Sequence, residues 1–265
     1  MADSSLYLVA ACVAGMGLHV PLHPQSVGFF ALQASIWCVS SGALVVARRR
    51  AWKRFHGGVE GNPPEWAHAF PAWTYDGSAC VMILTYVPFL LATAPRCFAS
   101  MDAFIAAHSR TYMAASYPEE FWLEHLIYSS LFGYMVRDML LFFHKPDLLF
   151  TIHHFCVCFL MVGISFWEIH GFRLLALTTA VVELGSASFS LWVLYRWRRQ
   201  YVFIMTVSNV FWVFAACACT VLHSATTLQI VMCSVGVSMA FARQGYLLWE
   251  VWCSSETRKE SAKAK

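Results

Sequence analysis

Charged residues are scarce in this sequence. Of its 265 residues, 12% are Asp, Glu, Lys or Arg, whereas an ordinary soluble domain carries roughly 25%. The net charge of +3 is too small to indicate nucleic-acid binding. Hydrophobic residues make up 59% of the chain and the mean hydropathy is +0.57. This surplus of apolar side chains argues against a soluble fold and indicates an integral membrane protein.

The chain also lacks the marks of a disulfide framework and of a cleaved leader. Most of its ten cysteines lie inside apolar runs, as in Cys156/Cys158, where a thiol behaves as a small hydrophobe. Residues 1–5 contain no Lys or Arg, so they lack the positive region that opens a cleavable signal peptide. We therefore expect the N-terminus to be retained.

Apolar stretches of the length that crosses a bilayer, about 18 residues or more, follow one another along the chain. The expected spans are residues 28–47, 78–95, 121–143, 148–170, 172–194, 201–222 and 226–250. Residues 5–20 form a shorter candidate that ends at Pro21, so seven or eight spans are expected. Residues 96–120 are predicted to form a loop with a short interfacial helix. The fold class predicted is all-α, with antiparallel neighbours joined by short connections after residue 121.

Basic residues divide the chain and predict its orientation. The predicted domains are three: residues 1–65 contain the N-terminal membrane segments and a basic loop, and residues 66–253 form the main membrane domain. Residues 254–265 form a charged tail that we expect to be disordered. Lys and Arg cluster at 48–54, at 196–199 and in that tail. The positive-inside rule places all three clusters in the cytosol, together with the C-terminus and the turn at 143–148.

Several expected spans carry polar side chains at a similar depth. At ~1.5 Å per helical residue, Asp138 and His153 lie roughly 8 Å inside the cytosolic ends of their spans. Arg243 and Gln244 lie about 10 Å inside theirs, and Asn209 about 12 Å. Ionisable groups at such depth are costly and indicate a functional site. We predict that these residues share one pocket; the alternative is scattered polar groups near helix ends.

A polar stripe marks the span at 172–194. Thr179, Glu183, Ser186 and Ser190 recur at i, i+4, i+7 and i+11, which is one helical face. A carboxylate near the middle of the membrane has to be protonated or paired, so we predict that Glu183 faces the pocket. The hydroxyl residues of the stripe are also typical of contacts between helices in lipid.

His153 and His154 are adjacent, so their side chains point about 100° apart and make a poor metal chelate. We predict no metal. An imidazole at this depth suits general-base or nucleophilic chemistry, with Asp138 as its expected partner. The alternative is a hydrogen-bonded histidine that ties two helices together. Glu124, His125 and Glu168 are expected at the opposite membrane interface.

The order of these motifs resembles the TLC-domain family over residues 66–253. The motifs are Gly133-Tyr134-x-x-Arg137-Asp138, His153-His154, and Glu183 followed by Ser188-Phe189-x-Leu191-Trp192-x-Leu194. The family includes the TRAM translocon proteins, the ceramide synthases and several small relatives. The resemblance implies a helical barrel around a lipid-sized cavity and a location in the endoplasmic reticulum.

In ceramide synthases the two-histidine motif transfers an acyl group from acyl-CoA to a sphingoid base. The resemblance therefore implies catalytic positions for His153 and His154, with acyl-CoA as co-substrate. The HD-x-x-D signature of those enzymes has no counterpart at residues 181–187, which read VVELGSA. The chain is thus more similar to the small relatives, whose roles include phospholipid composition, sphingolipid metabolism and cargo handling.

Three functions follow from the sequence. The first is membrane lipid homeostasis, with membrane lipids as partners and no bound cofactor. The alternatives are an acyl-CoA-dependent N-acyltransferase and a trafficking or translocon accessory. The candidate catalytic residues are His153, His154, Asp138 and Glu183, and the candidate substrate-binding residues are Arg137, Ser186, Ser190, Asn209, Arg243 and Gln244.

The predicted topology places both the basic loop and the C-terminus in the cytosol. Epitope tags inserted at Gly57 and after Lys265 should both be reached by antibody after permeabilisation of the plasma membrane alone. A tag that stays protected until all membranes are permeabilised would show that the span count is wrong by one.

Overall fold

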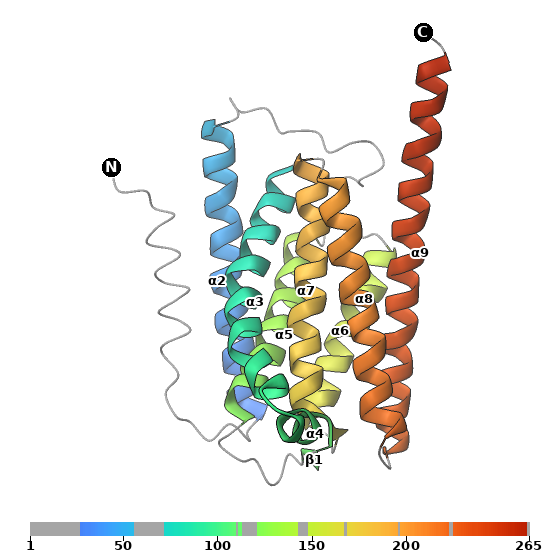
Figure 1. The fold of residues 1–265 in the computed structure, drawn as a ribbon. Coiled ribbons are helices and arrows are strands. Elements are labelled where there is room, and N and C mark those ends of the chain that lie inside the picture. The colour runs from blue at the N-terminus through green and yellow to red at the C-terminus, as the bar shows by residue number, and fades with distance from the viewer. Residues whose placement is uncertain are drawn as a thin grey trace.

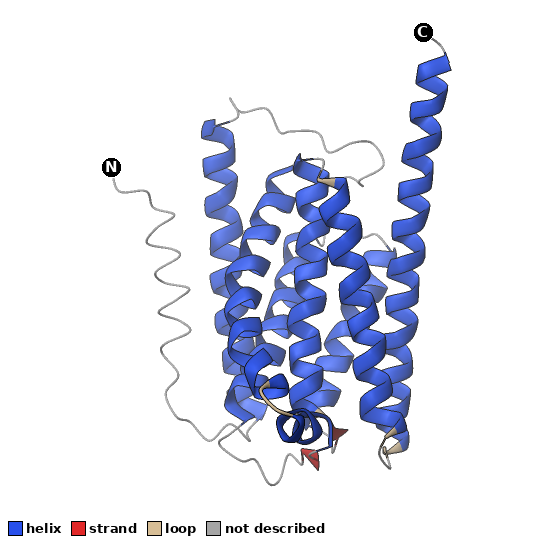
Figure 2. Cartoon of the chain, viewed as in Figure 1, coloured by secondary structure: helices blue, strands red, loops and turns tan. Residues whose placement is uncertain are grey.

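The computed structural model describes residues 27–55, 72–109, 111–112, 121–142, 148–166, 169–195, 197–222 and 225–263. Helices account for nearly all of these residues (Figures 1 and 2). They are α2 (Val27–Phe55), α3 (Ala72–Phe98), α4 (Met101–Ser109), α5 (Trp122–Phe142), α6 (Leu148–Phe166), α7 (Phe172–Tyr195), α8 (Arg198–Val221) and α9 (Thr227–Lys263). The all-α prediction is confirmed. The candidate at 5–20 and the turn at 143–147 lie outside the described residues.

Five helices are long and apolar enough to cross a membrane. These stretches are Phe30–Arg54, Trp73–Phe98, Phe172–Tyr195, Arg198–Val221 and Thr227–Trp249. Helix α5 is not among them; it contains four ionisable side chains at Glu124, His125, Arg137 and Asp138. In α6 the apolar stretch found within the described residues is shorter, Thr151–Ser165.

The long helices run side by side and alternate in direction (Figure 1). By their contacts they form a circuit in the order α2, α3, α7, α8, α9, α6 and α5, and α5 returns to α2. Helix α5 also packs on α7 across the middle of the bundle. The C-terminal end of α2, the start of α8 and the projecting half of α9 lie at the same end, as the basic clusters predict.

The short helix α4 and a pair of strands close the other end of the bundle (Figure 1). Ser100 caps α4, because its hydroxyl accepts a hydrogen bond from the Ala103 amide at 3.0 Å. The strands β1 (Thr111–Tyr112) and β2 (Ile169–His170) pair antiparallel. The Gln229 side chain accepts from the His170 amide at 2.9 Å and donates to the Cys219 carbonyl at 3.1 Å. This side chain thereby holds the start of α9 against β2 and α8.

Two helices approach one another closely at Gly133. A Cβ atom at this position would overlap the Ala34 carbonyl oxygen and lie 3.0 Å from the Cys38 amide nitrogen. Glycine is therefore the residue that allows α5 to pack directly on the backbone of α2. The glycine of the Gly133-Tyr134 motif thus sets the distance between these helices.

Glu124, which is expected near a membrane interface, lies in the first turn of α5 and is buried within the protein. Its side chain is 0% exposed and forms ion pairs with Arg173 at 2.9 Å and Arg96 at 3.2 Å. One carboxylate of α5 therefore connects α3 and α7. His125 is also buried, against the ring of Phe172 with a centroid distance of 4.9 Å. Glu168 lies outside the described residues.

The outward faces of the bundle are apolar. Val39 of α2, Leu91 of α3 and Val221 of α8 are 71%, 70% and 78% exposed. A soluble bundle would place polar residues there, whereas a bilayer accepts apolar ones.

The prediction of a disordered tail from residue 254 is wrong as far as Lys263, because α9 continues to that residue. Residues 254–263 include Glu, Lys, Arg and Ala, which favour helix and extend α9 without a break.

Two glycines offer a matched test of the packing between α2 and α5. We expect Gly133→Ala to lower the free energy of unfolding by about 1–3 kcal/mol, because the added methyl group forces the helices apart. Gly245→Ala on α9 should be neutral or stabilising by up to about 1 kcal/mol, since a Cβ there meets nothing within 4 Å. Thermal unfolding of the detergent-purified proteins measures both. Equal melting temperatures for the two variants would contradict the close approach.

Candidate functional site

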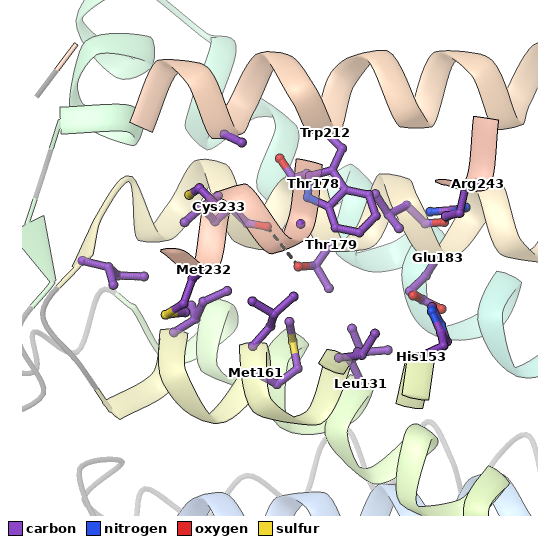
Figure 3. A pocket seen from close by; sticks show the side chains of 18 of the residues that line it. Leu131, His153, Met161, Thr178, Thr179, Glu183, Trp212, Met232, Cys233 and Arg243 are labelled. Atoms are coloured by element: carbon purple, nitrogen blue, oxygen red, sulfur yellow. Dashed lines mark hydrogen bonds between the residues drawn. The ribbon is translucent and has the colours of Figure 1, made fainter. Parts of the chain in front are cut away.

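An elongated pocket lies among α5, α6, α7, α8 and α9 (Figure 3). Its empty volume is about 800 Å³, including space open to the surroundings. Most of its wall is apolar: Leu131, Val157, Leu160, Met161, Ile164, Ile169, Leu175, Val182 and Met232. The lining of α6 extends from His153 to Ile164, which is ~16 Å at 1.5 Å per residue. The pocket therefore has a length close to the ~15 Å depth of one bilayer leaflet.

Polar groups gather at one end of this pocket. Figure 3 shows His153, Glu183 and Arg243 together at that end, with Met161 and Met232 toward the other. The three polar residues come from α6, α7 and α9. An apolar channel with an acid, a base and a cation at one end has the chemistry of an amphiphile-binding site.

Glu183 projects into the pocket from α7. Its side chain is 5% exposed, and Oε2 has no hydrogen-bond partner among the described residues. Thr179 and Ser186 of the predicted stripe line the pocket as well. Ser190 is buried and is not among the lining residues. The prediction that Glu183 lies in a pocket agrees with this geometry.

Arg243 reaches across from α9 to α7. Its Nη2 donates to the Val182 carbonyl at 3.2 Å and to Ser186 Oγ at 3.4 Å. It also contacts the Met205 sulfur at 2.9 Å, and the guanidinium lies over the Trp212 ring at 5.9 Å. All of these partners are neutral. The described residues place no carboxylate within ion-pair distance of Arg243, so its charge remains available to a ligand.

The two adjacent histidines point in different directions, as their spacing predicts. Their rings are 5.4 Å apart with an angle of 80° between the planes. His153 lines the pocket, whereas His154 is buried and its Nε2 lies 3.7 Å from Asp138 Oδ2. Only His153 is therefore positioned to meet a molecule in the pocket.

Asp138 belongs to a separate buried cluster. Arg137 is 1% exposed, and its Nε donates to Asp138 Oδ1 at 2.9 Å. The same guanidinium lies 4.2 Å from the centroid of the Tyr134 ring. Arg137, Asp138 and His154 are not among the residues that line the pocket. The prediction of one shared site for all the candidates is thus corrected: His153 and Glu183 meet in the pocket, while Asp138 and His154 meet outside it.

Asn209 and Gln244 connect two helices. Asn209 Nδ2 donates to Gln244 Oε1 at 2.9 Å, and Gln244 Nε2 donates to Thr206 Oγ1 at 3.2 Å. Neither residue is among those that line the pocket. These side chains, predicted to bind substrate, hold α8 against α9 through the two hydrogen bonds.

One wall of the pocket includes two residues, Gln229 and Gly236, that the sequence motifs did not indicate. Gln229, Gly236 and Arg243 line it from α9 and recur every seven residues, which is one helical face. At Gly236 a Cβ atom would lie 2.9 Å from Trp212 Nε1, so the glycine makes room for that indole. The seven-residue repeat was visible in the sequence and would have identified this face.

Metal binding has no candidate site in the part of the chain that the structure describes. There, no group of three or more His, Cys, Asp or Glu side chains is arranged to hold an ion.

The five apolar helices and the apolar outward surface define an α-helical integral membrane protein, with an internal pocket that is polar at one end. Comparison of the chain with protein-family models, curated proteins and solved structures gave no match. The similarity to the TLC-domain family therefore depends on the motifs alone.

Proposed function

We propose that this chain is a TLC-type, multi-pass membrane protein that binds the acyl chain of a membrane lipid and acts in lipid homeostasis. One observation supports this above the others: the pocket is an apolar channel about one leaflet deep, with His153, Glu183 and Arg243 at a single end. An acyl chain fits the apolar part, and a polar head group fits the end.

In this proposal α5 and α6 cross the membrane with the five apolar helices, so seven described helices form a barrel. The ionisable side chains of α5 support its crossing, because Glu124 and Arg137 are buried within protein and do not meet lipid. The basic end is cytosolic by the positive-inside rule. The location in the endoplasmic reticulum follows from the family resemblance.

A second candidate function is acyl transfer from acyl-CoA to a lipid amine. His153 in the pocket, beside Glu183, is the specific observation that favours it. In such a reaction the amine nitrogen attacks the thioester carbonyl, an amide forms and the CoA thiol leaves. His153 would accept the proton of the amine and return it to the CoA sulfur as that group leaves, while the Glu183 carboxylate would stabilise the intermediate imidazolium.

Filling the apolar channel tests lipid binding. We expect Met161→Trp to lower the amount of lipid that copurifies with the protein roughly tenfold or more, since the indole occupies the space of the acyl chain. Phe159→Trp is the matched control on the same helix, because Phe159 is 49% exposed and does not line the pocket. Native mass spectrometry of both variants gives the bound fraction. Equal lipid occupancy in the two variants would refute the binding site.

The two histidines separate binding from catalysis. If the chain is an acyltransferase, His153→Ala should reduce product formation by a hundredfold or more, in line with the loss of a general base. His154→Ala should instead act through stability, because it removes a neighbour of Asp138. Lipidomics of knockout cells that express each variant measures the products. Full restoration of the lipid profile by His153→Ala would exclude the acyltransferase and leave the binding function in place.

A further inference from the structure

An acidic and a basic side chain share the polar end of the pocket without a salt bridge between them. Glu183 and Arg243 both line it, yet no ion pair joins them. Arg243 Nη2 bonds to the carbonyl of Val182, the residue before Glu183, so the guanidinium and the carboxylate flank the same part of the pocket. A ligand that supplies both a negative and a positive group can pair with Arg243 and with the Glu183 carboxylate at the same time.

Each of the two side chains has capacity left for a ligand. Arg243 uses only Nη2 in its hydrogen bonds; Nε and Nη1 have no acceptor among the described residues. Glu183 Oε2 likewise has no hydrogen-bond partner among the described residues. A guanidinium binds phosphate through two parallel hydrogen bonds, and a carboxylate oxygen accepts a hydrogen bond from an ammonium group.

Gly185 fixes the guanidinium on the α7 side of the pocket. A Cβ atom there would lie 3.0 Å from Arg243 Nη2 and would overlap Ser208 Oγ. The missing side chain lets Arg243 lie against α7, at the same end of the pocket as Glu183 (Figure 3). The two charges are therefore held one beside the other along the wall, as the two charges of a zwitterionic head group are.

We infer that the pocket selects a single-chain lipid whose head group contains a phosphate and a primary ammonium group. The phosphate binds Arg243, the ammonium donates to Glu183 Oε2, and the acyl chain extends along the apolar wall. A primary ammonium is preferred to a quaternary one because it can donate an N–H hydrogen bond to Oε2, which a quaternary ammonium cannot. The acyl-lipid site is the proposed function, on which this inference rests.

Four probes with matched chains test this selectivity: lysophosphatidylethanolamine, lysophosphatidylcholine, lysophosphatidic acid and sphingosine. Affinities are measured on the purified full-length protein in nanodiscs, by displacement of a fluorescent fatty acid. Lysophosphatidylethanolamine should bind roughly tenfold or more tightly than each of the other three, because only it supplies both a phosphate and an N–H donor. Equal affinity for the ethanolamine and choline probes would overturn the ammonium assignment, and equal affinity for sphingosine would overturn the phosphate assignment.

Variants assign the contacts. Glu183→Gln should weaken lysophosphatidylethanolamine roughly tenfold or more and leave lysophosphatidic acid unchanged. Arg243→Gln should weaken both phosphate probes and spare sphingosine, whereas Arg243→Lys should retain part of the phosphate affinity. Asp102→Asn, at an exposed position on α4, is the control. Equal effects of Glu183→Gln on both phosphate probes would overturn the inference.

Failure of this inference differs from failure of the proposed function. If all four probes displace the fluorescent fatty acid equally, the head-group assignment is wrong and the acyl-chain site stands. If the wild-type protein binds neither the fatty acid nor any probe while its melting temperature shows that it is folded, the proposed function itself fails and the inference fails with it.

Discussion

The charges inside this bundle must find their partners within the protein, because neither an apolar core nor a lipid tail can solvate them. Helix α5 meets this constraint at both of its ends. Near its start, Glu124 takes two arginines from α3 and α7. Near its end, Arg137 binds the neighbouring Asp138 and lies over Tyr134, and His154 of α6 approaches the same carboxylate. The contacts of Glu124 and Asp138 thereby connect α5 to α3, α6 and α7.

The pocket stands out against this background of paired charges. Glu124 and Asp138 have arginine partners, whereas Glu183 and Arg243 face one space without forming a pair. Paired charges stabilise an arrangement of helices. An acid and a base that do not pair, at the end of a cavity, can each bind a group of a ligand. The same chemical groups thus have a structural role in one place and suggest a binding role in the other.

The motifs that resemble the TLC-domain family also fall into two groups, residues that form contacts between helices and residues that line the pocket. Gly133 and Asp138 set contacts between helices, and Trp192 stacks on Tyr201 with ring centroids 4.6 Å apart. His153 and Glu183 line the pocket. Most of the motif therefore sets contacts between helices, and two of its residues line the pocket.

The sequence determined the helices, because a run of apolar residues between polar connectors requires a helix of membrane length whatever its neighbours are. It also determined the divergence of His153 and His154, which follows from helical geometry alone. Only the tertiary structure decided which polar side chains meet. Equal depth along different helices does not determine the rotation of each helix about its axis, and therefore does not determine which side chains meet. In the structure Asp138 contacts Arg137 and His154, and Asn209 contacts Gln244. That rotation is set by the packing of whole helix faces, which is a property of the assembled bundle.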